Sequence, residues 1–189
     1  MKAATIALVS MLLALGSAPV RADEDEAKEH ANARIALGKA KLTMEQAVAA
    51  ALKEVPGGKA VEAELELESD NVVWEVEVVS GRKHMEVKLD AISGKVKEVE
   101  EEGKEGEKDE DEDEDEQAET DAAKAKITLS QAIATALKEV PGGKAFEAET
   151  EREDGKLVFE IELLSGDKVM EVEIDAMTGK VLEVEEEKE

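Results

Sequence analysis

The residues that could do chemistry in this chain are glutamates that alternate with apolar residues. Residues 72–90 read Val-Val-Trp-Glu-Val-Glu-Val-Val-Ser-Gly-Arg-Lys-His-Met-Glu-Val-Lys-Leu-Asp. The alternation has a period of two on both sides of Ser80-Gly81-Arg82, which is typical of a β-hairpin with one buried and one solvated face. We therefore predict that the acidic side chains of these strands share one face of a sheet.

The alternation also predicts which carboxylates are neighbours. With Gly81 and Arg82 as the turn, Trp74 faces Leu89 on the buried side, and the glutamates pair on the other side. Residues 60–68 alternate in the same way, and a turn at Asp70-Asn71 would place them beside the first strand of the hairpin. The solvated face then has two rows across three strands, which are Glu64, Glu77, Glu86 and Glu66, Glu75, Lys88.

The pattern occurs twice. Pro56 aligns with Pro141 and Gly94 with Gly179, at one constant offset and without a gap, so the chain is a tandem duplication. Glu173 stands in the second copy where the first has a lysine. The second copy therefore has two complete acidic rows, which are Glu149, Glu162, Glu171 and Glu151, Glu160, Glu173.

Such rows need an explanation, because like charges directly opposite each other destabilise a sheet. Two charges at roughly 5 Å repel by about 3 kcal/mol at an effective dielectric of about 20, and by less than about 1 kcal/mol in bulk water. The rows are either tolerated on a solvated face or used to bind a cation.

Clustered carboxylates without cysteine suit hard cations such as Ca²⁺ or trivalent lanthanides, and argue against Zn²⁺ and Cu²⁺. A trivalent ion would neutralise a row of three carboxylates fully, which favours a lanthanide over Ca²⁺. Two aspartates at the ends of strands are also candidates, although Asp90 fits a turn cap better than a metal ligand. The candidate metal ligands are Glu64, Glu66, Glu75, Glu77, Glu86, Asp90, Glu149, Glu151, Glu160, Glu162, Glu171, Glu173 and Asp175.

The N-terminal residues indicate export. Lys2 precedes an apolar stretch that is too short to span a bilayer, and Val20-Arg21-Ala22 resembles a cleavage site. We predict a signal peptide at residues 1–22 and a periplasmic or secreted protein. The formal net charge of −25 repels nucleic acid and anionic membranes, so metal ions or a basic protein are the expected partners.

The rest of the chain divides into an arm, two folded units and a linker. Residues 23–40 predict a flexible or marginally helical arm, in which His30 fits a solvated tail better than a loose metal site. Residues 103–124 are mostly acidic and predict a disordered linker. The folded units are residues 41–102 and residues 125–189.

Each folded unit begins with an amphipathic helix. In the first unit Thr43 and Gln46 fit a capping box, and Pro56-Gly57-Gly58 ends the helix. The strands follow, so their apolar face needs the helix as a cover. We expect an α+β fold of two units, each with one helix packed on an antiparallel sheet of about four strands.

The most distinctive residues of each unit follow the third strand. They read Val-Lys-Leu-Asp-Ala-Ile-Ser-Gly-Lys-Val at residues 87–96 and Val-Glu-Ile-Asp-Ala-Met-Thr-Gly-Lys-Val at residues 172–181. With the helix and the Pro-Gly-Gly break, they resemble the PepSY domain. That resemblance implies an exported or membrane-associated α+β module of the kind found in propeptides of secreted metallopeptidases. A tandem, highly acidic form is also similar to lanthanide-binding PepSY proteins.

Catalysis is not expected from these residues. Neither His30 nor His84 has an equivalent in the second unit, and nothing in the pattern desolvates one glutamate relative to another, as acid–base catalysis requires. Two functions stay open, which are the binding of hard cations and an interaction module that regulates a secreted peptidase or binds a basic partner. A third interpretation is that the acids only keep an exported protein soluble.

Overall fold

The structure is a computed structural model that describes residues 22–69, 71–101, 122, 124–153 and 155–187. The first part contains α1 Ala22–Lys39, α2 Met44–Glu54, β1 Lys59–Glu68, β2 Asn71–Ser80, β3 Lys83–Asp90 and β4 Val96–Glu101. The second contains α4 Leu129–Glu139, β5 Lys144–Glu153, β6 Lys156–Ser165, β7 Lys168–Asp175 and β8 Val181–Glu186. No helix among these residues is long and apolar enough to cross a membrane. The predicted signal peptide and acidic linker lie almost wholly outside the described residues.

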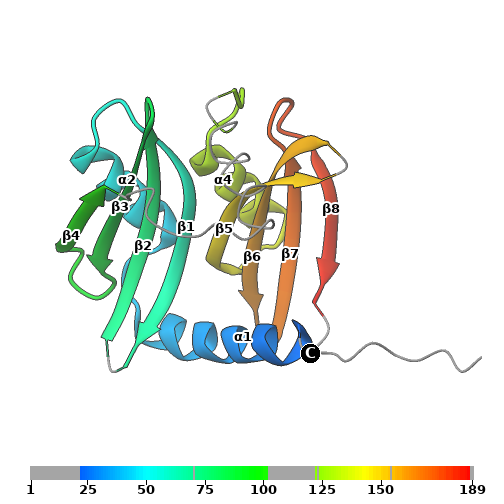
Figure 1. The fold of residues 1–189 in the computed structure, drawn as a ribbon. Helices are drawn as coiled ribbons and strands as arrows, with labels where there is room; N and C mark the ends of the chain where they lie inside the picture. Colours follow the sequence, from blue (N-terminus) through cyan, green and yellow to red (C-terminus); the bar gives the residue numbers. More distant parts are fainter. Residues whose placement is uncertain (1–21, 70, 102–121, 123, 154, 188–189) are drawn as a thin grey trace, which may run out of the picture.

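We call α2 with β1 to β4 repeat 1, and α4 with β5 to β8 repeat 2. Their described strands form one antiparallel sheet in the order β4-β3-β2-β1-β5-β6-β7-β8 (Figure 1). The predicted α+β class is confirmed, but the four strands expected in each unit belong to one continuous sheet. The repeats join edge to edge, because Ala63 of β1 pairs with Ala148 of β5. These alanines occupy equivalent positions, so an approximate twofold axis relates the two halves of the sheet.

The apolar half of each strand alternation forms one core that extends through both repeats. α2 packs on β1, β2 and β3, α4 packs on β5, β6 and β7, and the two helices contact each other. Thr43 and Thr128 begin the two helices with the same capping box. Trp74 is fully buried and donates its indole N–H to the carbonyl of Leu42 at 3.3 Å. The opposite side of the sheet, which we call the acidic face, has most of the glutamates of the strands.

The predicted register of the central hairpin is confirmed. Trp74 lies opposite Leu89 and Glu77 lies opposite Glu86, and β6 pairs with β7 in the equivalent way. The short turn between the strands leaves little freedom, so the hydrophobic pattern and the turn together determine the pairing.

The predicted register of the first hairpin was wrong by two residues. Glu64 lies opposite Glu75 rather than Glu77, because the turn begins one residue earlier than predicted. Ser69 adopts the left-handed φ of 55° that this turn requires. A displacement of two residues keeps every side chain on its own face, so the acidic face is as predicted while its rows change.

α1 is the largest departure from the sequence prediction. The stretch predicted as a flexible or marginally helical arm forms a helix of 18 residues. It packs against β1 and β5, and it crosses the lower ends of the strands in Figure 1. Ala33, Ala36 and Leu37 bury against the core, and the Arg34 guanidinium donates to the carbonyl of Asp167 at 3.3 Å. These contacts join residues far apart in the chain, so the local pattern of α1 does not contain them.

Candidate functional site

Four rows of side chains cross the acidic face at directly opposed strand positions, where Cβ atoms lie about 4.5–5.5 Å apart. In repeat 1 they are Glu62, Glu77, Glu86, Glu100 (the Glu86 row) and Glu64, Glu75, Lys88, Glu98 (the Lys88 row). In repeat 2 they are Glu147, Glu162, Glu171, Glu185 (the Glu171 row) and Glu149, Glu160, Glu173, Glu183 (the Glu173 row). Glu64 pairs with Glu147 across the junction, so the acidic face is continuous between the repeats.

The corrected register changes the first member of each row. Glu62 takes the place predicted for Glu64, and Glu147 takes the place predicted for Glu149. Glu66 lies opposite a valine instead of a glutamate. The same holds for its counterpart in repeat 2, Glu151.

A cavity of about 140 Å³ lies where α1 meets β5 and β6, and we call it the central cavity. Its lining consists of Glu29, His30, Glu147, Glu149, Glu151, Glu160 and Glu162. Ionised carboxylates only accept hydrogen bonds, so a wall of six glutamates offers ligands to a positive ion and none to an anion.

His30 attaches α1 to the wall of the central cavity. The residue is only 2% exposed, and its Nε2 atom lies 3.2 Å from Oε2 of Glu162. The ring meets Phe146 edge to face, with centroids 6.1 Å apart. Nδ1 has no hydrogen-bond partner among the described residues. The prediction that this histidine is exposed in a solvated tail was wrong, because α1 is a helix that buries it.

Burial raises the pKa of the carboxyl groups around the central cavity. The pKa of Glu160 rises to about 8, and neighbouring carboxylates add to the effect. Burial raises the pKa of Glu162 to about 7, although His30 opposes the shift. Burial and hydrogen bonds with Glu149 and Glu29 raise the pKa of Glu147 far above its usual range. Each group therefore favours either its neutral form or a nearby positive charge.

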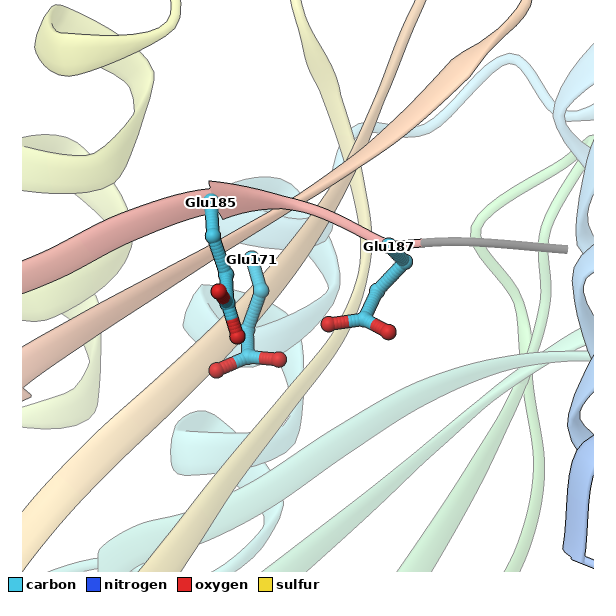
Figure 2. Close-up of side chains that lie close together, drawn as sticks. All are labelled: Glu171, Glu185 and Glu187. Atoms are coloured by element: carbon cyan, nitrogen blue, oxygen red, sulfur yellow. The ribbon is translucent and has the colours of Figure 1, made fainter.

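A second group of carboxylates lies next to the central cavity. One oxygen from each of Glu171, Glu185 and Glu187 lies within 4.8 Å of the others. Figure 2 shows the three side chains coming together from β7, β8 and the residue after β8. Burial and a hydrogen bond with Glu187 raise the pKa of Glu171 to about 9. Glu187 also acts on the charge of Glu162, so this group is electrostatically continuous with the central cavity.

Repeat 1 has a positive charge among its carboxylates. Lys88 Nζ lies 2.8 Å from a carboxylate oxygen of Glu75 and 3.1 Å from one of Glu86. Burial raises the pKa of Glu86, but the ammonium group opposes that shift. Burial also raises the pKa of Glu64, to about 7. The acids of repeat 1 are therefore partly neutralised within the protein.

The two predicted aspartate ligands stabilise turns. Oδ1 of Asp90 accepts the backbone N–H of Ser93 at 2.7 Å, and Oδ1 of Asp175 accepts that of Thr178 at 2.7 Å. Hydrogen bonds from the side chains and the backbone of Ser93 and Thr178 lower the pKa of both carboxyl groups. The turn role that the sequence allowed accounts for both residues.

The structure gathers some predicted ligands and separates others. Around the central cavity lie Glu149, Glu151, Glu160 and Glu162, with Glu171 and Glu173 on the neighbouring strand. In repeat 1 lie Glu75, Glu77 and Glu86, while Glu64 and Glu66 line a separate cavity of about 150 Å³ beside α1.

Sequence reasoning missed several residues of this surface. Glu62 and Glu147 belong to the predicted alternation, and a register displaced by two residues would have found them. Glu185 and Glu187 belong to the last strand and the residue after it. No local signal identifies Glu29, because its place depends on how α1 packs against β1 and β5.

Both repeats match a known family pattern. Residues 41–100 and residues 126–185 each match PepSY, the peptidase propeptide and YPEB domain. A putative lipoprotein from Clostridium difficile 630 is a similar solved structure, with 24% identity and a TM-score of 0.42 over 78% of this chain and 95% of that chain. The Bacillus megaterium YpeB C-terminal domain has 16% identity and a TM-score of 0.29 over 80% of this chain and 68% of that chain. No curated protein gives a match.

Proposed function

The chain belongs to the PepSY family, as its sequence predicted, and we propose that it binds hard multivalent cations through the carboxylates of its acidic face. PepSY domains are propeptide-type modules, which supports a binding role rather than a catalytic one. The central cavity is the main site of this proposal.

The observation that supports the proposal most directly is the composition of the central cavity. Six glutamates and one histidine line about 140 Å³ beneath α1. The only basic side chain of the lining, His30, already contacts Glu162. Carboxylates held together away from water are unfavourable unless they take up protons or a metal ion. A bound cation would supply the charge that the protein does not.

The donor set favours hard cations. Ca²⁺ takes six to eight oxygen ligands and accepts both monodentate and bidentate carboxylates, a requirement that a wall of glutamates can meet. A trivalent lanthanide has the same preference for oxygen and neutralises one more charge, so the density of acids favours it. Zn²⁺ and Cu²⁺ prefer imidazole and thiolate ligands, which are scarce here because the chain has no cysteine and two histidines.

The family match supports a second proposal. A PepSY module could bind and regulate a secreted peptidase, or another basic partner, through the same negative surface. PepSY proteins are typically exported, in agreement with the periplasmic or secreted location that residues 1–22 predict. Pull-down from a periplasmic extract, with and without a chelator, would separate a partner that binds the protein itself from one that needs the metal.

Calorimetric titration of the purified protein with TbCl₃ and with CaCl₂ tests the first proposal. We expect saturable binding at micromolar metal or below, with terbium tighter than calcium. The double change Glu147→Gln with Glu162→Gln removes two carboxylates from the central cavity and should weaken terbium binding at least about tenfold, which corresponds to about 1.4 kcal/mol.

The duplication supplies a matched control, because Glu62→Gln with Glu77→Gln removes the equivalent pair from repeat 1. This variant should weaken terbium binding much less, since α1 does not enclose these residues in the central cavity. Absence of saturable terbium binding in the unmodified protein would refute the proposal. Equal losses of terbium affinity in both double variants would show that the site is not the central cavity.

A further inference from the structure

Lys88 marks a cation position on the acidic face of repeat 1. Its ammonium nitrogen lies 2.8 Å from Glu75, 3.1 Å from Glu86 and 3.9 Å from Glu68. These carboxylates come from three neighbouring strands, β1, β2 and β3. Three acidic side chains therefore surround one positively charged atom, and the side chain that bears it is only 25% exposed.

The duplication places the same carboxylates in repeat 2 without the ammonium group. Glu153, Glu160 and Glu171 are the equivalents of the three acids around Lys88, and Glu173 replaces the lysine itself. The backbone positions also correspond, because Glu160 lies opposite Glu173 as Glu75 lies opposite Lys88. Repeat 2 therefore has a fourth carboxylate where repeat 1 has its positive charge.

The side chains of Glu153 and Glu173 meet in repeat 2, where their carboxyl groups are in hydrogen-bond contact. Glu160 lies opposite Glu173 on the neighbouring strand, and the negative charges of these two groups act on each other. Repeat 2 thus brings carboxyl groups from β5, β6 and β7 to the region that the ammonium group of Lys88 occupies in repeat 1.

We infer that Glu153, Glu160 and Glu173, with Glu171 at the border, form a second site for a hard multivalent cation, and that Lys88 is a built-in counter-ion that closes the equivalent site of repeat 1. The inference rests on the proposed function. It specifies that repeat 2, and not repeat 1, binds a metal ion at this position of the acidic face. The residue at this one position determines whether a repeat supplies its own cation or binds one from solution.

Reciprocal exchange of the two residues tests the inference, with terbium as the probe and calorimetry as the measurement. Lys88→Glu should add about one bound terbium ion per chain, and Glu173→Lys should remove about one while binding in the central cavity persists. Lys53→Glu and Glu54→Lys serve as controls with the same changes in charge. They lie in the last turn of α2, which packs on the opposite side of the sheet, and should leave the stoichiometry unchanged.

Melting temperatures keep the test informative if one variant folds poorly. Without metal, Glu173→Lys should melt higher than the unmodified protein, because it recreates the pairing of repeat 1, and Lys88→Glu should melt lower and recover when terbium is added. If Glu173→Lys, or folded Lys88→Glu, binds as many terbium ions as the unmodified protein, the inference is wrong. The proposed function still holds in that case, as long as the unmodified protein binds terbium. Absence of any terbium binding in the unmodified protein refutes both.

Discussion

The two repeats have the same backbone plan and a different charge on the acidic face. Their strands pair in equivalent registers, and their helices begin with the same capping box. Lys88 of repeat 1 lies among carboxylates, and Glu173 takes its place in repeat 2. The fold depends on the apolar alternation and on the turns, so the solvated face can change its charge while the sheet is maintained. The repeats differ in what they can bind rather than in how they fold.

α1 makes a second difference between the halves of the sheet. Phe146 of repeat 2 packs against His30 of α1, whereas its equivalent in repeat 1, Val61, packs with Val79 and Ala122. The cavity lined by His30 and six glutamates therefore forms beside repeat 2, whereas four glutamates and no histidine line the cavity beside repeat 1. A helix outside the duplicated unit gives a nearly symmetric sheet an asymmetric site.

The largest effects should come from breaking the core that the repeats share. Trp74→Ala and Phe159→Ala each remove a fully buried aromatic side chain and should lower the free energy of unfolding by about 3–5 kcal/mol. Each variant should still unfold in one transition, because the core and the pairing of β1 with β5 connect the repeats. Denaturation followed by circular dichroism measures both quantities.

An exposed apolar residue provides the control for this comparison. Leu182 of β8 is 43% exposed, and Leu182→Ala should change the free energy of unfolding by no more than about 0.5 kcal/mol. Two separate transitions, of which each aromatic variant shifts only one, would show that the repeats fold independently.

A smaller effect should appear in the pH dependence of stability without metal. Burial raises the pKa of Glu160 from 4.5 to about 8, so from about pH 4.5 to pH 8 the folded protein binds more protons at this group than the unfolded chain. The resulting stabilisation is complete below the unfolded value and is lost as the pH rises through the folded value. The melting temperature in chelator should fall between about pH 5 and pH 9, by at least about 3 °C, which corresponds to about 1 kcal/mol for a chain of this size.

Single substitutions connect this pH dependence to the difference between the repeats. Glu160→Gln should flatten the fall in melting temperature more than Glu75→Gln, because Lys88 lies 2.8 Å from Glu75 and already supplies a positive charge. Saturating terbium should also flatten it by replacing the protons. Equal effects of the two substitutions would mean that Lys88 does not distinguish the repeats.

The comparison also shows what the sequence could predict about the strands. The alternation predicted the face of the glutamates in the first three strands of each repeat, and the short turn at Gly81 predicted the register of the central hairpin. The predicted register of the first hairpin was displaced because an alternating pattern has a period of two, so a shift by two residues fits the pattern equally well. Only the position of the turn, which begins at Ser69 instead of Asp70, distinguishes the alternatives.

The site was harder to predict than the sheet. The alternation found Glu160 and Glu162 because they belong to a strand, but the cavity exists only where α1 covers them. α1 has almost no amphipathic pattern of its own, and its place depends on contacts such as that of His30 with Glu162. Such contacts between distant residues follow from the packed structure and not from local periodicity.

The smallest effects should come from a feature that the repeats share. Thr43 and Thr128 accept the backbone N–H of the glutamine three residues later at 3.4 Å and 3.3 Å, and each glutamine accepts the threonine N–H in return. Thr43→Ala and Thr128→Ala should each lower the free energy of unfolding by about 1 kcal/mol and leave terbium binding unchanged, because both caps belong to the helices on the opposite side of the sheet. If one of them weakened terbium binding, the helices would influence the acidic face, and differences in binding between the repeats could no longer be assigned to Lys88 and α1 alone.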